Sequence, residues 1–439
     1  MTDQAEARYA NPDVTPPLAE AIPLGLQHVL AMFASNITPS IIVAGAAGLA
    51  FGGAEQVYLI QMAMLFAGIA TLFQTVGIGP VGSRLPIMQG TSFAFVSVLT
   101  AIAATEGLGV ALTACLVGGI IHFGFGAIIG RIRFLFPPLV TGLVILAIGL
   151  YLIPVAVKYA AGGAAKFQME AESFGSLEHW SVALVVVIVA IVAKFYFRGI
   201  ISAAAVLVGL VAGYVLALIL GMVSFAPVEK AGLVAVPDIL PYGLEFSLGA
   251  VIAVTLICIV SAVETVGDTS ATAKAGANRD ATDKEIAGAT YADGLGTALA
   301  SVFGGLPNTS FSQNVGIVGM TGIMSRHVVT IGAIILVVCG FLPKIGAVIA
   351  SMPLPVLGGG VIVMFGMVAA AGLNMLSTVT MNRRNMVIIA VSLAFGLGLN
   401  LVPTAVQYLP GVLHTMAVSG LLPTAVIAIV LNQVLPEDI

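Results

Sequence analysis

Residues 307–322 read PNTSFSQNVGIVGMTG, a run of small and polar residues between long apolar stretches. Residues 89–95 read QGTSFAF, so the Thr-Ser-Phe triplet of residues 309–311 occurs here as well. Each run is too polar for a continuous membrane helix, which needs about 20 apolar residues. Irregular backbone at membrane depth is tolerated only where protein or a water-filled cavity satisfies its polar groups. The two runs therefore predict interrupted membrane segments beside a cavity.

The composition indicates that the solvent of this chain is lipid. Of its 439 residues, 59% are hydrophobic and 8% are charged, whereas a soluble domain carries about 25% charged residues. The net charge is −4 and no basic block suggests a nucleic acid partner. Three cysteines lie in apolar runs without metal-ligand or disulfide spacing, and we interpret them as small buried side chains. We expect no metal site and no cofactor. Residues 1–21 lack the pattern of a signal peptide and are expected to remain as a polar tail.

Fourteen runs are suited to cross a hydrocarbon core about 30 Å thick, and the two interrupted runs are the third and the tenth. We therefore expect an all-α polytopic membrane protein with fourteen transmembrane segments. The first seven lie near residues 22–50, 57–79, 86–104, 107–128, 135–158, 179–197 and 199–221, and the second seven near 247–273, 285–304, 309–323, 327–351, 354–376, 385–402 and 412–434.

The positions of lysine and arginine support this count, because positive charge prefers the cytoplasmic side. With the N-terminus inside, most of these residues, Lys194 among them, fall at cytoplasmic loops or segment ends. The opposite side holds only Lys158, Lys166, Lys230 and Lys344. The asymmetry predicts an even number of segments with both termini in the cytoplasm. We expect a multi-pass protein of the plasma membrane, which in a bacterium is the inner membrane.

The two sets of seven segments resemble each other. The Pro-x2-Val-x-Gly pattern of residues 137–142 recurs at 353–358, at nearly the same offset as the Thr-Ser-Phe triplet. Because seven is odd, the second copy must enter the membrane from the opposite side, which gives 7+7 inverted repeats. Interrupted helices at matching positions of two such repeats point to a substrate site near the midplane. The simpler alternative is a pair of kinked helices packed on their glycines.

Three acidic residues fall inside predicted segments: Glu264 and Asp268 in the eighth, and Asp293 in the ninth. A charge at the bilayer centre costs at least about 2.5–3.5 kcal/mol, so it is retained mainly where it has a function or a partner. Glu264 and Asp268 are four residues apart and share one helix face. His28 is a further polar residue at depth. For each of these residues the alternative is a structural role, bracing neighbouring helices.

The tenth segment places two carboxamides, Gln313 and Asn314, next to each other. An amide offers a donor and an acceptor in one plane, which suits the edge of a heterocycle. The third segment offers Phe93 and Phe95 as faces on which a flat ring can stack. A carboxylate, a carboxamide and an aromatic ring together predict a nucleobase site. They suit an anion site less well, because such a site prefers arginine, lysine or a helix N-terminus.

The order Gln313-Asn314-x-Gly316-x4-Thr321-Gly322 resembles the signature of the nucleobase–ascorbate transporter family. In that signature Gln, Glu or Pro precedes Asn-x-Gly-x4-Thr, and Arg, Lys or Gly follows it. The resemblance covers most of the chain, from the first segment to the tenth. It extends to Gln27-His28, Gly90-Thr91-Ser92-Phe93-Ala94-Phe95, Glu264-x3-Asp268, Ala292-Asp293-Gly294 and Pro307-Asn308-Thr309.

The resemblance implies two domains, each built from both repeats. Segments 1–4 and 8–11 form a core, segments 5–7 and 12–14 form a gate that often dimerises, and segments 3 and 10 contain short paired β-strands. All three buried acids lie in the core so defined. The implied divisions are the cytoplasmic tail 1–21, the core at 22–133 and 247–352, and the gate at 134–246 and 353–439 with its short tail.

The resemblance also implies roles for particular residues. Glu264 accepts hydrogen bonds from ring N–H groups, Gln313 pairs with the purine edge, and Phe93 stacks on the base. Glutamine at position 313 is similar to the xanthine and uric acid branch, whereas uracil carriers tend to have Glu there and ascorbate carriers Pro. Among the supporting residues, Asn314 lies beside Gln313, the backbone near Ser312 adds a contact, and Ser92 contributes to a preference for an oxidised purine. Asp293 acts in proton coupling or core stability. Asp268 and His28 belong to surrounding networks.

We therefore expect a homodimeric, proton-coupled symporter of xanthine or uric acid that works by alternating access and is not an enzyme. Uracil or another base is the alternative within the family, and Na⁺ is the alternative coupling ion. An anion exchanger of similar architecture would be expected to lack Glu264. An aspartyl intramembrane protease is disfavoured because its Gly-x-Gly-Asp motif ends here in Thr297, after Gly294-Leu-Gly296.

Overall fold

The computed structural model describes residues 11–163, 166–167, 169 and 171–436. Residues 1–10 of the predicted tail, with Arg8, and residues 437–439 lie outside this description. The first half contains α2 (Leu18–Ala46), α3 (Ala54–Val76), β1 (Gln89–Thr91), α4 (Val96–Thr105), α5 (Leu108–Phe125), α6 (Ile129–Ile132), η1 (Arg133–Leu135), α7 (Pro138–Ala160), α9 (Leu177–Tyr196), α10 (Ile200–Ala203), α11 (Ala205–Ile219) and α12 (Ala226–Lys230).

The second half repeats much of this order. It contains α13 (Leu248–Ala277), α14 (Asp283–Val302), β2 (Asn308–Ser310), α15 (Ser312–Thr321), α16 (Arg326–Gly340), α17 (Pro343–Ala350), α18 (Leu354–Leu376), α19 (Arg383–Leu401), η2 (Pro403–Val406), α20 (Gly411–Val418) and α21 (Leu421–Val434).

Within the described residues, eight helices are long and apolar enough to cross a membrane. A ninth span results if α16 and α17, which are bent by 81° against each other, are taken together. The expectation of a mostly helical, polytopic membrane protein is confirmed. The count of fourteen segments and the inverted repeat remain predictions. Among the described residues, helix α2 begins at Leu18, within the predicted tail.

The interrupted segments meet at the centre of the fold. β1 lies in the third predicted segment and β2 overlaps the start of the tenth, and the two strands pair antiparallel with Gly90 opposite Thr309. The pair continues beyond the strands, because the amide of Ser92 donates to the carbonyl of Pro307 at 2.8 Å. A Cβ at Gly90 would lie 2.5 Å from the Phe311 ring, so glycine permits this close approach. The short helices α4 and α15 begin just after the strands.

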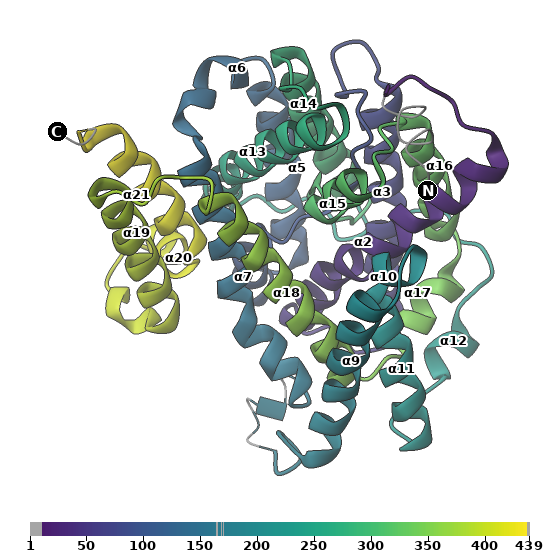
Figure 1. The fold of residues 1–439 in the computed structure, drawn as a ribbon. Coiled ribbons are helices and arrows are strands. Elements are labelled where there is room, and N and C mark those ends of the chain that lie inside the picture. The colour runs from purple at the N-terminus through teal and green to yellow at the C-terminus, as the bar shows by residue number, and fades with distance from the viewer. Residues whose placement is uncertain (1–10, 164–165, 168, 170, 437–439) are drawn as a thin grey trace.

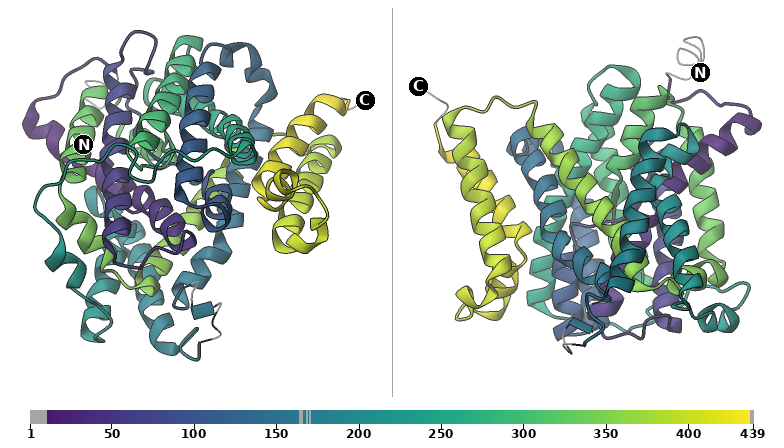
Figure 2. Two further views of the ribbon diagram at one scale, coloured as in Figure 1. Left: turned by 180° about the vertical axis from the view of Figure 1, so that it is seen from behind. Right: turned by 60° about the horizontal axis from the view of Figure 1, so that its bottom comes forward.

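The surrounding helices pack in pairs that match between the halves. Helix α14 packs on α5 as α3 packs on α16, and α13 contacts α5 as α2 contacts α16. Helices α7 and α18 lie along each other through a long contact. At one end α9 and α11 pack against α18, whereas α19, α20 and α21 form a separate group beyond α7 (Figures 1 and 2). The strand pair contacts α2, α3, α13 and α14 and thus lies inside one group of helices.

Candidate functional site

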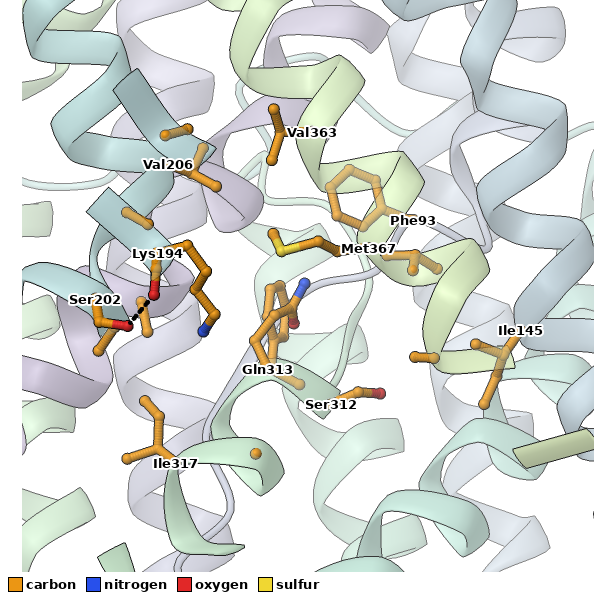
Figure 3. Close-up of a pocket in the computed structure, with 18 of the residues that line it drawn as sticks. Phe93, Ile145, Lys194, Ser202, Val206, Ser312, Gln313, Ile317, Val363 and Met367 are labelled. Carbon is orange, nitrogen blue, oxygen red and sulfur yellow. Dashed lines mark hydrogen bonds between the residues drawn. The ribbon is translucent and has the colours of Figure 1, made fainter. Parts of the chain in front are cut away.

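A cavity of about 550 Å³ lies beside the strand pair. One wall comes from α2, α13, the two strands and α15, and the other from α7, α9, α10, α11 and α18 (Figure 3). Four predicted site residues line this cavity: Phe93, Glu264, Ser312 and Gln313. Residues far apart in the sequence therefore meet at one space between the two groups of helices.

The two walls differ in polarity. The wall at the strands carries the Glu264 carboxylate, the Gln313 amide and the hydroxyl-bearing residues Thr309 and Ser310. The facing wall is largely apolar, with Ile145 and Ile148 of α7, Val363, Met367 and Val368 of α18, and Ile191 and Phe195 of α9, and its exceptions are Lys194 and Ser202.

Glu264 is placed on the cavity wall by α13. One of its carboxylate oxygens, Oε2, is buried and has no hydrogen-bond partner among the described residues. One turn earlier on α13, Ser261 donates to Thr309 Oγ1 at 3.2 Å and fixes the helix against β2. A buried acceptor without a partner is costly. Because Glu264 lines the cavity, its carboxylate is available to a hydrogen-bond donor that enters the site.

Asp268 lies one turn after Glu264 on the same helix but does not line the cavity. Its Oδ1 accepts a hydrogen bond from Ser312 Oγ at 2.7 Å. Ser312 itself lines the cavity and begins α15. Asp268 therefore positions the start of α15 through Ser312.

Asp293 is fully buried on α14 and likewise lies away from the cavity lining. Its Oδ1 accepts from Gln89 Nε2 at 2.5 Å and its Oδ2 accepts from the Thr265 hydroxyl. Since Gln89 belongs to β1 and Thr265 to α13, one carboxylate joins three elements that carry the site. This arrangement supports a bracing role for Asp293.

Asn314 and His28 contact each other behind the cavity. The Asn314 amide nitrogen lies 3.0 Å from His28 Nδ1 and donates to the His28 carbonyl, also at 3.0 Å. Both side chains are buried, and neither lines the cavity. Asn314 therefore attaches α15 to α2, while Gln313, the preceding residue, faces the cavity (Figure 3).

Phe93 and Ser92 also have different environments. The Phe93 ring lines the cavity and packs edge-on against Phe365 of α18, with ring centroids 5.1 Å apart and an interplanar angle of 85°. The Ser92 side chain is 2% exposed, and its Oγ accepts from the Ala94 amide at 3.3 Å. Phe93 is the aromatic surface of the site, and Ser92 stabilises the turn that presents it.

The sequence assigned no site role to Lys194, Gln89 or Met367. Lys194 lines the cavity from the end of α9, and Met367 lines it from α18. In the sequence, Lys194 contributes only to the positive charge expected on the cytoplasmic side. Met367 belongs to an apolar segment, in which no local pattern distinguishes a cavity-lining residue from one that faces lipid. Gln89 precedes the Gly-Thr-Ser-Phe motif, and its contact with Asp293 depends on the pairing of distant segments.

Two further observations complete the search for a site. Among the residues that the structure describes, no group of three His, Cys, Asp or Glu side chains could hold a metal ion. A second cavity of about 660 Å³ lies against residues 50–54 and α12, and none of the predicted site residues lines it. The cavity at the strand pair is therefore the candidate site.

Comparison with known proteins identifies most of the chain as a permease. The sequence model of xanthine and uric acid permeases, described as the permease family, matches residues 19–405. The chain is 38% identical to the uric acid permease PucK of Bacillus subtilis, over 93% of this chain and 94% of that one. It is 35% identical to the xanthine permease XanQ of Escherichia coli, over 96% and 92%.

Among solved structures, the fold is similar to the transmembrane domain of the cyanobacterial bicarbonate transporter BicA. The TM-score is 0.63 and the sequence identity 16%, and the match covers 95% of this chain and 98% of that one. At this identity the likeness concerns the fold alone.

Proposed function

Since the chain belongs to the nucleobase–ascorbate transporter family of xanthine and uric acid permeases, we propose that it carries xanthine or uric acid across the membrane by secondary active transport. Family membership makes it a multi-pass membrane transporter and not an enzyme. Uracil or another nucleobase is the alternative substrate, and the 38% and 35% identity to uric acid and xanthine permeases favours the oxidised purines.

The observation that carries this proposal is the composition of the polar wall. Phe93, Glu264 and Gln313 line one cavity of about 550 Å³. Xanthine, a dioxopurine, and uric acid, a trioxopurine, are flat and carry both N–H donors and carbonyl acceptors. Glu264 accepts hydrogen bonds from ring N–H groups, Gln313 pairs with a neighbouring edge through its donor and acceptor, and Phe93 presents an aromatic surface. The backbone near Ser312 adds a contact.

Movement of the substrate follows from the division into two domains. The core, residues 22–133 and 247–352, holds the acids and the strand pair, and the gate, residues 134–246 and 353–439, supplies the apolar wall. The matching helix pairs of the two halves support an inverted repeat, as in many secondary transporters. In alternating access the polar wall carries the base past the apolar wall and exposes it on either side.

Coupling to a proton would use a carboxylate of the core. Glu264 at the cavity is the first candidate, because a proton there removes its charge before the core moves. Asp293, with its contacts to Gln89 and Thr265, and Asp268, with its contact to Ser312, link such a change to β1, α13 and α15. The alternative coupling ion is Na⁺.

The proposed setting is the bacterial inner membrane, with both termini in the cytoplasm and a homodimer in the bilayer. Helix α19 supports a contact outside the monomer, because only Ile388, Ser392 and Gly396 of this helix are buried. Such an exposed apolar face is covered by lipid or by a second copy of the chain.

The test is uptake of radiolabelled xanthine, urate and uracil in cells without their own carriers, with and without a protonophore. We expect accumulation of xanthine or urate that the protonophore abolishes and that removal of Na⁺ does not change. Uptake of uracil alone would overturn the substrate assignment, and accumulation that persists with the protonophore but requires Na⁺ would overturn proton coupling.

A further inference from the structure

Among the described residues, Lys194 is the one cation on the apolar wall of the cavity. We propose that Lys194 determines specificity by favouring the anionic form of an oxidised purine over a neutral purine. This inference rests on the proposed function and deepens it, because it adds a charge preference to the nucleobase site. It also assigns a recognition role to the gate, whose other lining residues are mostly apolar.

The position of Lys194 is defined by the end of α9. The residue lies in the last turn of this helix, and its carbonyl accepts a hydrogen bond from Ser202 Oγ of α10 at 3.0 Å. Its side chain extends into the cavity on the side where Gln313 lies (Figure 3). In the part of the chain that the structure describes, Lys194 takes part in no ion pair. Its ammonium group is therefore available to a negative charge that enters the site.

The charge of Lys194 is exposed at the cavity wall. Its neighbours Ile191 and Phe195 are exposed as well, and with Val206 they form the adjacent apolar part of the wall. The charge therefore attracts an anion that enters the cleft but is partly screened. An ammonium group is a compact point charge with rotatable donors, so it needs no fixed planar geometry in its partner. That property suits a purine anion, in which the charge is spread over ring nitrogens and carbonyl oxygens.

The two charged residues of the cavity then have complementary tasks. Glu264 on the core wall accepts from the N–H groups that the purine retains, and Lys194 on the gate wall attracts the edge that has lost a proton. Uric acid is a stronger acid than xanthine, so there is a pH at which uric acid is ionised and xanthine is neutral. At that pH Lys194 lowers KM for urate and leaves KM for xanthine nearly unchanged.

The experiment compares Lys194→Gln, Lys194→Met and Lys194→Arg with the unmodified chain, using urate and xanthine at a pH where only uric acid is ionised. Lys194→Met keeps an unbranched aliphatic chain and serves as a second neutral variant. Lys274→Gln is the matched control, because Lys274 also lies in the last turn of a helix, α13, but does not line the cavity. Uptake is normalised to the amount of protein in the membrane.

We expect both neutral variants to raise KM for urate about tenfold, the effect of one partly screened charge, with a change of less than about twofold for xanthine. Lys194→Arg and the control should keep the ratio of the two KM values. An equal change for both purines, or no change in either, would overturn the inference while purine uptake itself persisted. Absence of any purine uptake by the unmodified chain would instead contradict the proposed function.

Discussion

The two interrupted segments have the same backbone plan, and their side chains serve different purposes. In the first segment the Gln89 amide donates to Asp293, and the Thr91 hydroxyl and amide donate to Asn36. In the second segment Ser312 and Gln313 line the cavity, although Ser312 also donates to Asp268 and Asn314 donates to the His28 carbonyl. Since the first segment uses its polar groups internally, Phe93 is its main surface for a ligand.

This difference indicates that the two segments have different tasks. Under the proposed function, the first segment stabilises the strand pair and the second recognises the substrate together with Glu264. Among the described residues the Gln313 side chain takes part in no hydrogen bond that would hold it away from the cavity. Substitutions in the recognising part should therefore alter transport at unchanged stability, and substitutions in the stabilising part should do the reverse.

The largest effect is expected for Glu264→Gln, which removes the carboxylate at the recognising segment. Glutamine keeps one oxygen acceptor, but its NH2 group replaces the other oxygen and faces a ring N–H donor. Loss of a hydrogen bond to a charged group costs about 1.5–3 kcal/mol, so uptake falls by about ten- to a hundredfold or more. Radiolabelled purine uptake, normalised to protein in the membrane, measures the effect. The matched control is Glu178→Gln, at an exposed acid in the first turn of α9. Full active uptake by Glu264→Gln would remove this carboxylate from the mechanism.

The next effect is expected for Gln313→Ala. The variant loses the paired donor and acceptor at the purine edge, so KM for the purine rises about tenfold or more. Because Gln313 takes part in no hydrogen bond within the described chain, the melting temperature of the purified protein should stay nearly constant. A large fall in melting temperature with an unchanged KM would make Gln313 a structural residue and would remove the distinction between the segments.

Gln89→Ala tests the stabilising segment. It leaves Oδ1 of the fully buried Asp293 without its 2.5 Å donor, and an unsatisfied buried group costs about 1–3 kcal/mol or more when it is charged. We expect a lower melting temperature and less protein in the membrane, with a smaller change in KM than in Gln313→Ala. A KM change as large as that of Gln313→Ala at unchanged stability would mean that both segments recognise the substrate.

The sequence predicted the class of the fold but not how the two segments divide their tasks. Composition and apolar runs are local properties, so they indicated a helical membrane protein, and the repeated Thr-Ser-Phe triplet marked both interruptions. Gln313 and Asn314 are adjacent amides with the same chemistry, and only their orientations on α15 distinguish them. Successive residues on a helix point about 100° apart, so one faces the cavity and the other His28.

The environments of Glu264 and Lys194 show the same limit. Glu264 was recognisable because a carboxylate inside an apolar segment is costly and needs a reason to be there. Lys194 lies at a segment end, where positive charge is common on the cytoplasmic side. Its place on the cavity wall depends on how α9 packs against α18, a long-range contact that no local pattern reveals.

The smallest effect is expected for Ser92→Ala, although the resemblance to the family suggested a contribution of Ser92 to substrate preference. Its hydroxyl is buried, accepts from the Ala94 amide and does not line the cavity. Loss of one such hydrogen bond costs about 0.5–1.5 kcal/mol of stability, and the ratio of KM values for xanthine and urate should change by less than about twofold. Uptake of both purines and a thermal melt provide the two measurements. Because Ser92 directly precedes Phe93, a shift in the KM ratio at unchanged stability would mean that the first segment also discriminates between substrates, through the turn that presents the ring.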